Sequence, residues 1–497
     1  MISNIMEDSL SNINLEELNL DKPVRDLLGR LLNHIETLTK ENRQFKEEIQ
    51  QLRDENARLK GEKGKPEIKA NKKDQEKSQA DAKKKEQTKR TINKEEGKER
   101  SERIKIDREE VRKLERSKLP EDVEHRGYRE VVIQNIKFQS DNVLYRLERM
   151  YSPREGKFYE AKLPEGLSQQ RYGNELRAFI IRQYFELRTP QEKIVEMLCS
   201  EEIVISAGEV SQIITNKHIE VFEQERKEIV LAGLESTSYQ NIDDTGGREN
   251  GVNQVVTVIC NPYFSSFYTN PRKDAETVSK LLSDLENTPQ IAQLESKAKT
   301  LDKYIEILLA DDAKQFHNQT SFRALCWIHE DRHYKKLNPY FQEHQKLVEE
   351  FRKDLWDYYS ELKAYKTQPT QQDKDRLLLA FDKLFSRTTG YLELDHRIEL
   401  TKQKKAQLLV VLDYPEVPLH NNDAEQAVRE VVIKLKISNG TRTEEGTKSW
   451  DIFLSLLGTC TKLSVNFYRY ILDRISNSYN MPSLAQLIRQ QSQSAPT

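Results

Sequence analysis

The stretch YQNIDDTGGREN, residues 239–250, joins a short strand-forming run to two consecutive aspartates, Asp243 and Asp244. Tyr, Gln, Asn and Ile before them, with glycines after, predict a β-strand that ends at the acids. Acidic side chains suit the end of a strand, because strand ends place side chains on an open rim of the sheet. This stretch therefore predicts a domain that mixes helices with a sheet and carries acidic groups at the sheet's edge.

Two further segments carry acids in similar settings. YIEILLADD, residues 304–312, predicts a buried strand that ends in Asp311 and Asp312, and PLHNNDAEQAVREVV, residues 418–432, opens a helix that contains Glu425. Successive side chains on a strand point to opposite faces. Only one aspartate of each pair is therefore expected to face a shared site.

Asp243, Asp311 and Glu425 are the candidate catalytic and metal-ligating residues. Converging carboxylates repel each other unless cations hold them, so Mg²⁺ or Mn²⁺ is the expected cofactor. Two such ions about 4 Å apart promote in-line phosphoryl displacement. We expect Asn421 and Asn422 to cap the helix of Glu425. Each acid taken alone is usually an ordinary loop residue, and only the three together indicate a site.

Composition narrows the class of protein without identifying it. The 497 residues predict two to four domains, and 80 basic against 82 acidic side chains leave a net charge of −2, which does not indicate nucleic acid. The four cysteines form no CxxC pair, which argues against a disulfide framework and against a zinc site. Neither a signal peptide nor a membrane span is expected, and the predicted location is the cytoplasm.

Residues 1–60 contain a heptad pattern. Apolar residues and two asparagines alternate in steps of three and four, at Leu28, Leu31, Ile35, Leu38, Asn42, Phe45, Ile49, Leu52, Asn56 and Leu59. Such spacing predicts a coiled coil, and asparagines at one heptad position favour a dimer. The alternative is a long helix that packs on its own protein. Residues 61–118 are rich in lysine and predict a flexible linker, whose lysines either contact DNA phosphates or serve as a solvated tether.

Residues 119–235 predict a small sheet followed by helices. YREVVIQNIKF, NVLYRLERMY and KFYEAKL indicate three short strands, and the helices that follow fit a helix-turn-helix unit. Ser206 is the expected cap of the second helix, whose exposed face carries candidate DNA-binding residues Ser211, Gln212 and Lys217. A plain helical hairpin without DNA is the alternative, because this face is only mildly basic.

The remaining chain divides into regions of different predicted secondary structure. Residues 236–332 alternate strands and helices. NQVVTVICN and YFSSFYTN predict an antiparallel hairpin, DAETVSKLLSDL predicts a helix, and ALCWIHEDRHYKKL predicts a further apolar strand with a charged exit. Residues 333–410 predict a helical insertion, residues 411–480 return to the sheet-forming domain, and residues 481–497 predict a frayed polar tail. Trp327 on such a strand is either a core residue or a DNA contact.

Several blocks resemble the insertion-sequence 66-type DDE transposases, bacterial enzymes with an RNase H-like catalytic core. DDTGGR resembles the family's DET, LLADDA its second acid, CWIHEDRHYKKL its CWAHARRKF block and VPLHNNDAEQAVR its IPLDNNRAERALR block. ISNGTRTEEGTKSW and LLGTCTKLSVNFYRYI resemble the C-terminal signature. The likeness covers about residues 120–480 and implies an RNase H-like core in two parts, 236–332 and 411–480, interrupted by the insertion.

The resemblance also implies roles for individual residues. It makes Asp243, Asp311 and Glu425 the three catalytic acids, and it places further candidate DNA contacts at His329, Arg332, Arg429, Lys436 and Arg442. For Arg429, a salt bridge to a nearby acid is the equal alternative. Many relatives carry a zinc-binding cysteine cluster that this chain lacks, so no zinc is predicted. Glu330 and Asp331 replace basic residues of the family, which predicts weaker phosphate contacts beside the site.

The function expected from this resemblance is DNA transposition. The protein would cleave at the ends of its insertion sequence and transfer the 3′-OH ends to target DNA, with double-stranded DNA of the terminal repeats and of the target as partners. The coiled coil would pair two subunits into a homodimer associated with the bacterial nucleoid. The alternatives are an inactive or repurposed DNA-binding relative and a metal-dependent nuclease.

Overall fold

The computed structural model describes residues 21–59, 108–111, 128, 140–163, 171–286 and 305–494. The chain forms two compact units, residues 1–41 together with 140–497, and residues 42–139. Most of the predicted linker and the first predicted strand of the small sheet lie outside the described residues. Among the described helices, none combines the length and the apolar character that crossing a bilayer requires.

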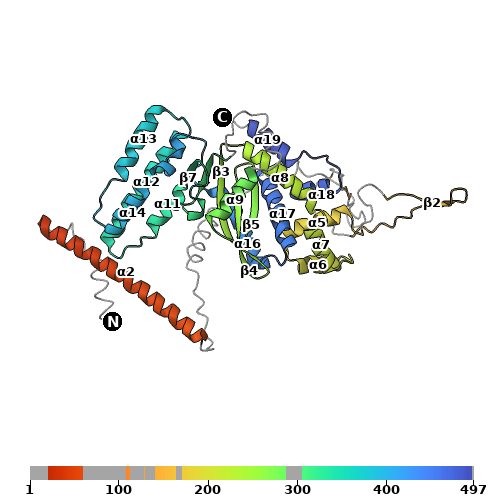
Figure 1. The fold of residues 1–497 in the computed structure, drawn as a ribbon, viewed down its shortest axis with the longest axis horizontal. Helices are drawn as coiled ribbons and strands as arrows, with labels where there is room; N and C mark the ends of the chain where they lie inside the picture. Colours follow the sequence, from red (N-terminus) through yellow and green to blue (C-terminus); the bar gives the residue numbers. More distant parts are fainter. Residues whose placement is uncertain are drawn as a thin grey trace, which may run out of the picture. The chain divides into compact units, whose positions relative to one another are not determined.

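A five-stranded mixed sheet forms the centre of the larger unit, in the order β5-β4-β3-β6-β7 (Figure 1). The strands are β3 (Tyr239–Glu249), β4 (Val252–Cys260), β5 (Ser265–Asn270), β6 (Ile307–Ala310) and β7 (Phe322–Leu325). β3, β4 and β5 pair antiparallel, as the sequence predicts for the hairpin β4–β5, whereas β6 runs parallel to both β3 and β7. The four residues of β6 are all buried, which is typical of a parallel strand covered on both faces.

A helical block packs on this sheet through α17 and α8, and Figure 1 shows α5 and α7 on the side of α17 that faces away from the sheet. The block consists of α5 (Asn174–Phe185), α6 (Gln191–Ser200), α7 (Ala207–Thr215), α8 (Ile219–Glu235), α17 (Glu444–Lys462), α18 (Phe467–Ile475) and α19 (Leu484–Ser494). Ser206 caps α7 as predicted, by accepting a hydrogen bond from the backbone N–H of Glu209. α9 (Ala275–Glu286) also forms where the sequence predicts a helix.

Helix α17 protects the edge strand β5. Three side chains spaced four residues apart, Asp451, Ser455 and Thr459, accept hydrogen bonds from the backbone N–H groups of Thr269, Phe267 and Ser265 at 2.8, 2.9 and 3.2 Å. An exposed edge strand offers its unpaired N–H groups to other chains. Side chains return to the same face of a helix about every four residues, and backbone N–H groups return to the same side of a strand every two. The three side chains of α17 therefore match successive outward N–H groups along the edge of β5.

The helical insertion forms its own hydrophobic core. It consists of α12 (Gln342–Tyr365), α13 (Gln371–Leu384), α14 (Leu392–Lys402) and the short α15 (Lys405–Leu408). Trp327 is 1% exposed within that core and lies beside Tyr358 and Phe381. Trp327 is therefore a core residue, one of the two readings that the sequence left open.

Two predictions about secondary structure are wrong. The strand expected over ALCWIHEDRHYKKL ends at Leu325, and Trp327–Lys335 form helix α11. The tail expected to fray instead contains α19, because Leu484, Ala485 and Ile488 recur at helical spacing and are buried against the block.

The N-terminal heptad segment is a single helix, α2 (Lys22–Leu59). The small sheet contains two described strands, β1 (Arg149–Ser152) and β2 (Lys157–Glu160), which pair antiparallel as a hairpin. The helix and the hairpin agree with the sequence prediction. Pairing of α2 with a second subunit stays a prediction.

Candidate active site

Asp243 lies on β3, and Asp311 directly follows the neighbouring strand β6 at the matching level. In the parallel pair β3–β6, Tyr239 faces Ile307 and Asn241 faces Leu309, a constant offset of 68 residues (307 − 239 and 309 − 241). Asp243 and Asp311 have the same offset (311 − 243 = 68) and follow the last paired residues by two positions. Neighbouring strands are about 4.8 Å apart, so the two carboxylates share one face at one level of the sheet.

The position of Asp243 within its strand differs from the prediction. β3 does not end at the aspartates but continues to Glu249, because β4 pairs with it antiparallel from Asn241 to Glu249. Only the parallel pairing with β6 stops at Asn241. The open rim that the sequence predicts therefore exists on the β6 side of β3 alone.

The second aspartate of each pair is already neutralised by cations. The Asp244 carboxylate is 4% exposed, lies 2.5 Å from Lys273 Nζ and accepts a hydrogen bond from Gln315 Nε2 at 2.7 Å. Asp312 lies 2.7 Å from Lys404 Nζ and 3.3 Å from Arg323. Burial would raise the pKa of Asp312, but Lys404 and Arg323 outweigh burial and hold that pKa below its usual value.

Asp243 has the opposite environment. Its Oδ1 accepts a hydrogen bond from the Asp244 backbone N–H at 2.8 Å, and no described cation forms an ion pair with it. Burial, together with the charges of Asp311, Asp244 and Glu425, raises the pKa of Asp243 to about 7. A carboxylate held among other carboxylates and out of water attracts a cation strongly. The expected division of roles between Asp243 and Asp244 fits these surroundings.

Glu425 lies on α16 (Asn422–Ser438) and faces two residues of α11. Its carboxylate accepts a hydrogen bond from Arg332 at 2.9 Å, and His329 Nδ1 lies 3.5 Å from its other oxygen. Arg332 also approaches His329 Nε2 at 2.7 Å. Because the guanidinium only donates, Nε2 is the acceptor and the imidazole proton sits on Nδ1, toward Glu425. His329 and Arg332 are thus gathered at the third acid.

The predicted capping role of Asn421 is wrong, and its actual contacts concern the site. Asn421 is the residue before α16, but its side chain makes no capping bond. Its Nδ2 donates to the Ile242 carbonyl and its Oδ1 accepts from Asn241 Nδ2, both at 2.8 Å. Asn421 is fully buried. It therefore ties the start of the Glu425 helix to the strand residue that precedes Asp243, a contact that the sequence does not reveal.

Glu330 and Asp331 do not face the site, contrary to the expectation that they weaken phosphate contacts there. Glu330 is buried and binds Arg397 and Lys404, and Asp331 is buried and binds Arg352 at 2.7 Å. Their charges are used to fasten α11 to the helical insertion. The insertion thereby holds the helix that presents His329 and Arg332.

One further group of ligand atoms lies at the same place. Atoms of Cys326, His329 and Glu425 all lie within 4.8 Å of one another, a set that is able to hold a metal ion. The proton on His329 Nδ1 blocks that ligand atom, so these three residues do not ligate a cation together in this arrangement.

The other predicted DNA-binding residues lie at the surface. Arg429, Lys436 and Arg442 are exposed, and among the described residues none of them forms an ion pair, which removes the salt-bridge alternative for Arg429 there. Gln212 and Lys217 are exposed near the end of α7, Ser211 is half-buried, and Lys217 pairs with Glu209. In the described part of the chain, none of these three residues forms a hydrogen bond or an ion pair with Asp243, Asp311 or Glu425.

Comparison with known proteins gives the family. The model of the family described as "Transposase IS66 family" matches residues 169–449, more than half of the chain. The chain is also 36% identical over 169 residues to the uncharacterized protein y4jO of Sinorhizobium fredii (strain NBRC 101917 / NGR234). That alignment covers 34% of this chain and 52% of the relative, so the chain spans about half of the relative's length. With more than half of its residues matched, the chain belongs to the IS66 family of transposases.

Proposed function

We propose that this transposase is of the DDE type, with Asp243, Asp311 and Glu425 as its catalytic acids. It cleaves DNA at the ends of its insertion sequence and transfers the freed 3′-OH ends to target DNA. The order β5-β4-β3-β6-β7, three antiparallel strands followed by two parallel ones, supports an RNase H-like core interrupted by the helical insertion.

The observation that carries this proposal is the contrast between adjacent acids. Asp244 and Asp312 each have their own cation, whereas Asp243 has none among the described residues and lies close to Asp311 and Glu425. A purely structural cluster of acids would be neutralised throughout, because a buried unpaired charge costs free energy. An uncompensated acid among acids is what a cation site requires.

The donor set fits Mg²⁺ or Mn²⁺, since all three groups offer carboxylate oxygens. Bound there, such ions supply the positive charge that activates an attacking oxygen and stabilises a leaving oxygen in an in-line displacement. The protein's own contribution is placement: the β3–β6 register sets Asp243 level with Asp311, and Asn421 sets Glu425 against β3. Water is the first nucleophile, and the freed 3′-OH is the second.

DNA contacts are proposed for the exposed basic residues near the start and along the length of α16. Arg332 is 45% exposed at the mouth of the site, and its guanidinium is able to contact a phosphate through two N–H groups. Arg429, Lys436 and Arg442 extend the basic surface, and His329 lies behind Arg332. Residues 119–235, with Ser211 and Gln212 on α7 and Lys217 just after it, are proposed to bind the terminal repeats.

The proposed assembly is a homodimer formed through α2, since two element ends must meet for transfer. We place its action in the bacterial cytoplasm, at the nucleoid. The second candidate function is a metal-dependent nuclease that uses the same acids without transferring strands.

An assay with pre-cleaved ends separates these functions. Double-stranded DNA that carries the element's terminal sequence and a free 3′-OH is incubated with supercoiled plasmid and Mg²⁺. The transposase proposal predicts covalent joining of the end to the plasmid. Cutting of uncleaved ends without any joining of pre-cleaved ends would assign the nuclease function instead.

A further inference from the structure

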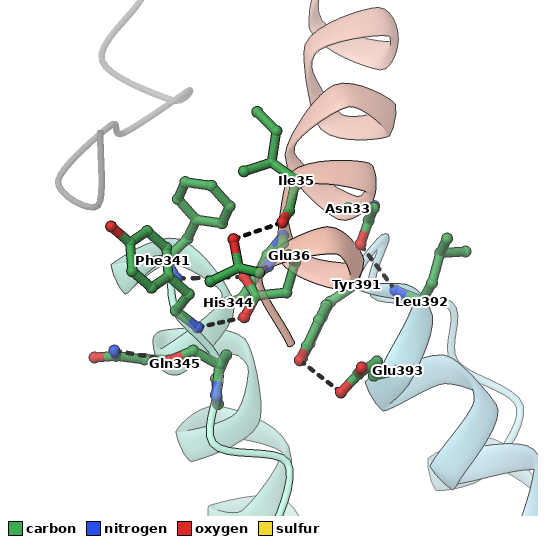
Figure 2. A network of polar contacts seen from close by, with 12 residues as sticks. Asn33, Ile35, Glu36, Phe341, His344, Gln345, Tyr391, Leu392 and Glu393 are labelled. Atoms are coloured by element: carbon green, nitrogen blue, oxygen red, sulfur yellow. Dashed lines mark hydrogen bonds and ion pairs between the residues drawn. The ribbon is translucent and has the colours of Figure 1, made fainter. Parts of the chain in front are cut away.

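Helix α2 uses one of its faces to hold the helical insertion (Figure 2). Glu36, which is 6% exposed, accepts hydrogen bonds from the backbone N–H groups of Tyr340 and Phe341 and lies 3.2 Å from His344 Nδ1. α12 begins one residue later, and no side chain of its own caps it. Glu36 therefore binds the N–H groups of the two residues just before α12, where a negative charge is also favoured by the helix dipole.

The same face of α2 fastens the start of α14. Asn33 Nδ2 donates to the Gly390 carbonyl at 2.8 Å, and its Oδ1 accepts from the Leu392 N–H at 3.2 Å. Lys40 adds an ion pair with Glu393 at 2.6 Å. Figure 2 shows the two contact points of α2: Glu36 contacts the start of α12, and Asn33 contacts the start of α14. α2 thus bridges two helix starts that are about fifty residues apart in the chain.

The opposite face of α2 is apolar and exposed. We use the name seam for the residues at the a and d positions of its successive heptads. They are Leu31, Ile35, Leu38, Asn42, Phe45, Ile49 and Leu52. Phe45 and Leu52 are 58% and 59% exposed, whereas Leu32 on the docked face is 6% exposed. A continuous exposed apolar stripe on a long helix marks an interaction surface.

From Leu31 onward the heptad positions separate the two faces, whereas Leu28, at the preceding a position, packs on the docked face with Leu32 and Phe341. With the seam at a and d, the residues that hold the insertion fall at e (Leu32), f (Asn33 and Lys40) and b (Glu36). Positions b and f lie on the outside of a coiled coil. A second helix is therefore able to cover the seam while the first contacts with the insertion remain in place.

Charges beside the seam select the partner and its direction. Glu41 and Glu48 occupy g positions, and Lys46 and Arg53 occupy the e positions five residues further on. In a parallel, in-register pair, each g residue meets the following e residue of the other helix, so Glu41 meets Lys46 and Glu48 meets Arg53, and both pairs join opposite charges. An antiparallel pair would place glutamates opposite glutamates and cations opposite cations, which is unfavourable. The charges of α2 are therefore complementary to those of a second α2 helix.

We propose that the seam pairs, parallel and in register, with the seam of a second copy, and that each copy carries its helical insertion on the outer face of the coil. The proposal rests on the dimer in the proposed function and gives it a direction and a register. Asn42 would then meet Asn42 of the second copy, where a buried asparagine fixes the register. Because α2 holds the insertion, pairing of two α2 helices would fix the distance and orientation between the two insertions. Each insertion in turn holds its own α11.

A disulfide test reads the direction and the register without any activity assay. In full-length protein with Cys199, the exposed native cysteine, replaced by serine, Asn42→Cys places a thiol at an a position and Arg43→Cys places one at a b position. A parallel, in-register pair predicts rapid oxidation to a covalent dimer for Asn42→Cys and little for Arg43→Cys. Equal crosslinking of both variants, or none in either, would overturn the proposal.

Light-scattering mass of the same protein tests the seam itself. Wild type is expected at twice the chain mass of 58.4 kDa. Leu38→Asp is expected to be monomeric with an unchanged thermal midpoint of the insertion, and Thr37→Asp, at an outward position, is the dimeric control. A wild-type monomer, or a Leu38→Asp dimer, would contradict the proposal. Neither readout depends on DNA cleavage, so this result stands apart from that of the proposed function.

Discussion

Asp243 and Asp244 are adjacent in the chain but have opposite surroundings. Strand alternation turns them to opposite faces, and Lys273 neutralises only Asp244. Asp243 is left among like charges, with a pKa raised to about 7. At the scale of single residues, the site thus gives up stability at Asp243, as the proposed cation site requires.

The first prediction concerns stability without metal. A raised pKa in the folded state means that the contribution of Asp243 to stability is full below its unfolded pKa, near 3.8, and is lost as the pH rises through about 7. Asp243→Asn should therefore raise the free energy of unfolding in EDTA at about pH 8, by on the order of 2 kcal/mol, and much less at about pH 5. Urea unfolding at both pH values measures the difference.

Added Mg²⁺ supplies the control for that experiment. It should stabilise wild type and leave Asp243→Asn nearly unchanged, because binding to the folded state alone raises stability. Asp244→Asn is the matched variant and should be destabilised, since it leaves Lys273 without its partner. Stabilisation of Asp243→Asn by Mg²⁺ equal to that of wild type would exclude Asp243 as a ligand.

Asn421 is a positioning residue for the same site. Asn421→Ala removes both hydrogen bonds to β3 and should cost about 2 kcal/mol of stability. If it also positions Glu425, the Mg²⁺ concentration for half-maximal DNA cleavage should rise several-fold under conditions where the variant is fully folded. Asn422→Ala, an exposed neighbour, is the control. An unchanged metal requirement would leave Asn421 with a structural role only.

At the scale of elements, α16 is fastened to β3 at both ends. Asn421 binds β3 at its start, and beyond its other end the Thr441 N–H donates to the Arg248 carbonyl at 3.0 Å. Gly440, between them, has a φ of +100°, and a Cβ there would lie 2.2 Å from the Arg248 oxygen. The direction of the helix, and with it the place of Glu425, depends on this close approach.

Gly440→Ala should therefore be strongly destabilising. The left-handed backbone and the contact with β3 together cost about 2 kcal/mol or more. Thermal unfolding should show a lower midpoint than for Gly251→Ala, which shares a positive φ but has open space around the added carbon. Equal losses in the two variants would mean that the approach to Arg248 does not matter.

The sequence predicts a helix or a strand well where a single hydrophobic periodicity runs through the segment. It predicts poorly where a strand passes directly into a helix. The heptads of α2, the β4–β5 hairpin and the buried strand β6 follow from periodicity and composition. The strand expected through Trp327 is wrong because β7 has only four residues and passes into α11 at Cys326. Apolar residues continue across that boundary, so periodicity alone does not reveal the change.

Within the site, the three acids were identifiable from sequence, but their supports were not. Spacing and resemblance indicate Asp243, Asp311 and Glu425. The bonds of Asn421 to β3 and of Lys404 to Asp312 join residues 180 and 92 positions apart (421 − 241 and 404 − 312). No local pattern marks such partners, because they arise only when the sheet and the insertion are folded together.

At the scale of the whole molecule, the insertion links the site to the N-terminal helix. Its Lys404, Arg397 and Arg352 hold α11 through Glu330 and Asp331, and the starts of α12 and α14 are held by α2. The chain therefore connects the surface proposed for pairing to the helix that presents His329 and Arg332. We expect variants of the seam to impair strand transfer more than binding of a single DNA end.

The most direct test of the central claim is Mg²⁺-dependent cleavage and joining of the element's own ends by wild type and by Glu425→Gln. The glutamine keeps the shape of the side chain and the helix but removes the charge. The account predicts that wild type cleaves and joins, and that the variant binds the same DNA with neither reaction. Cleavage and joining by Glu425→Gln at the wild-type rate would show that the active site lies elsewhere.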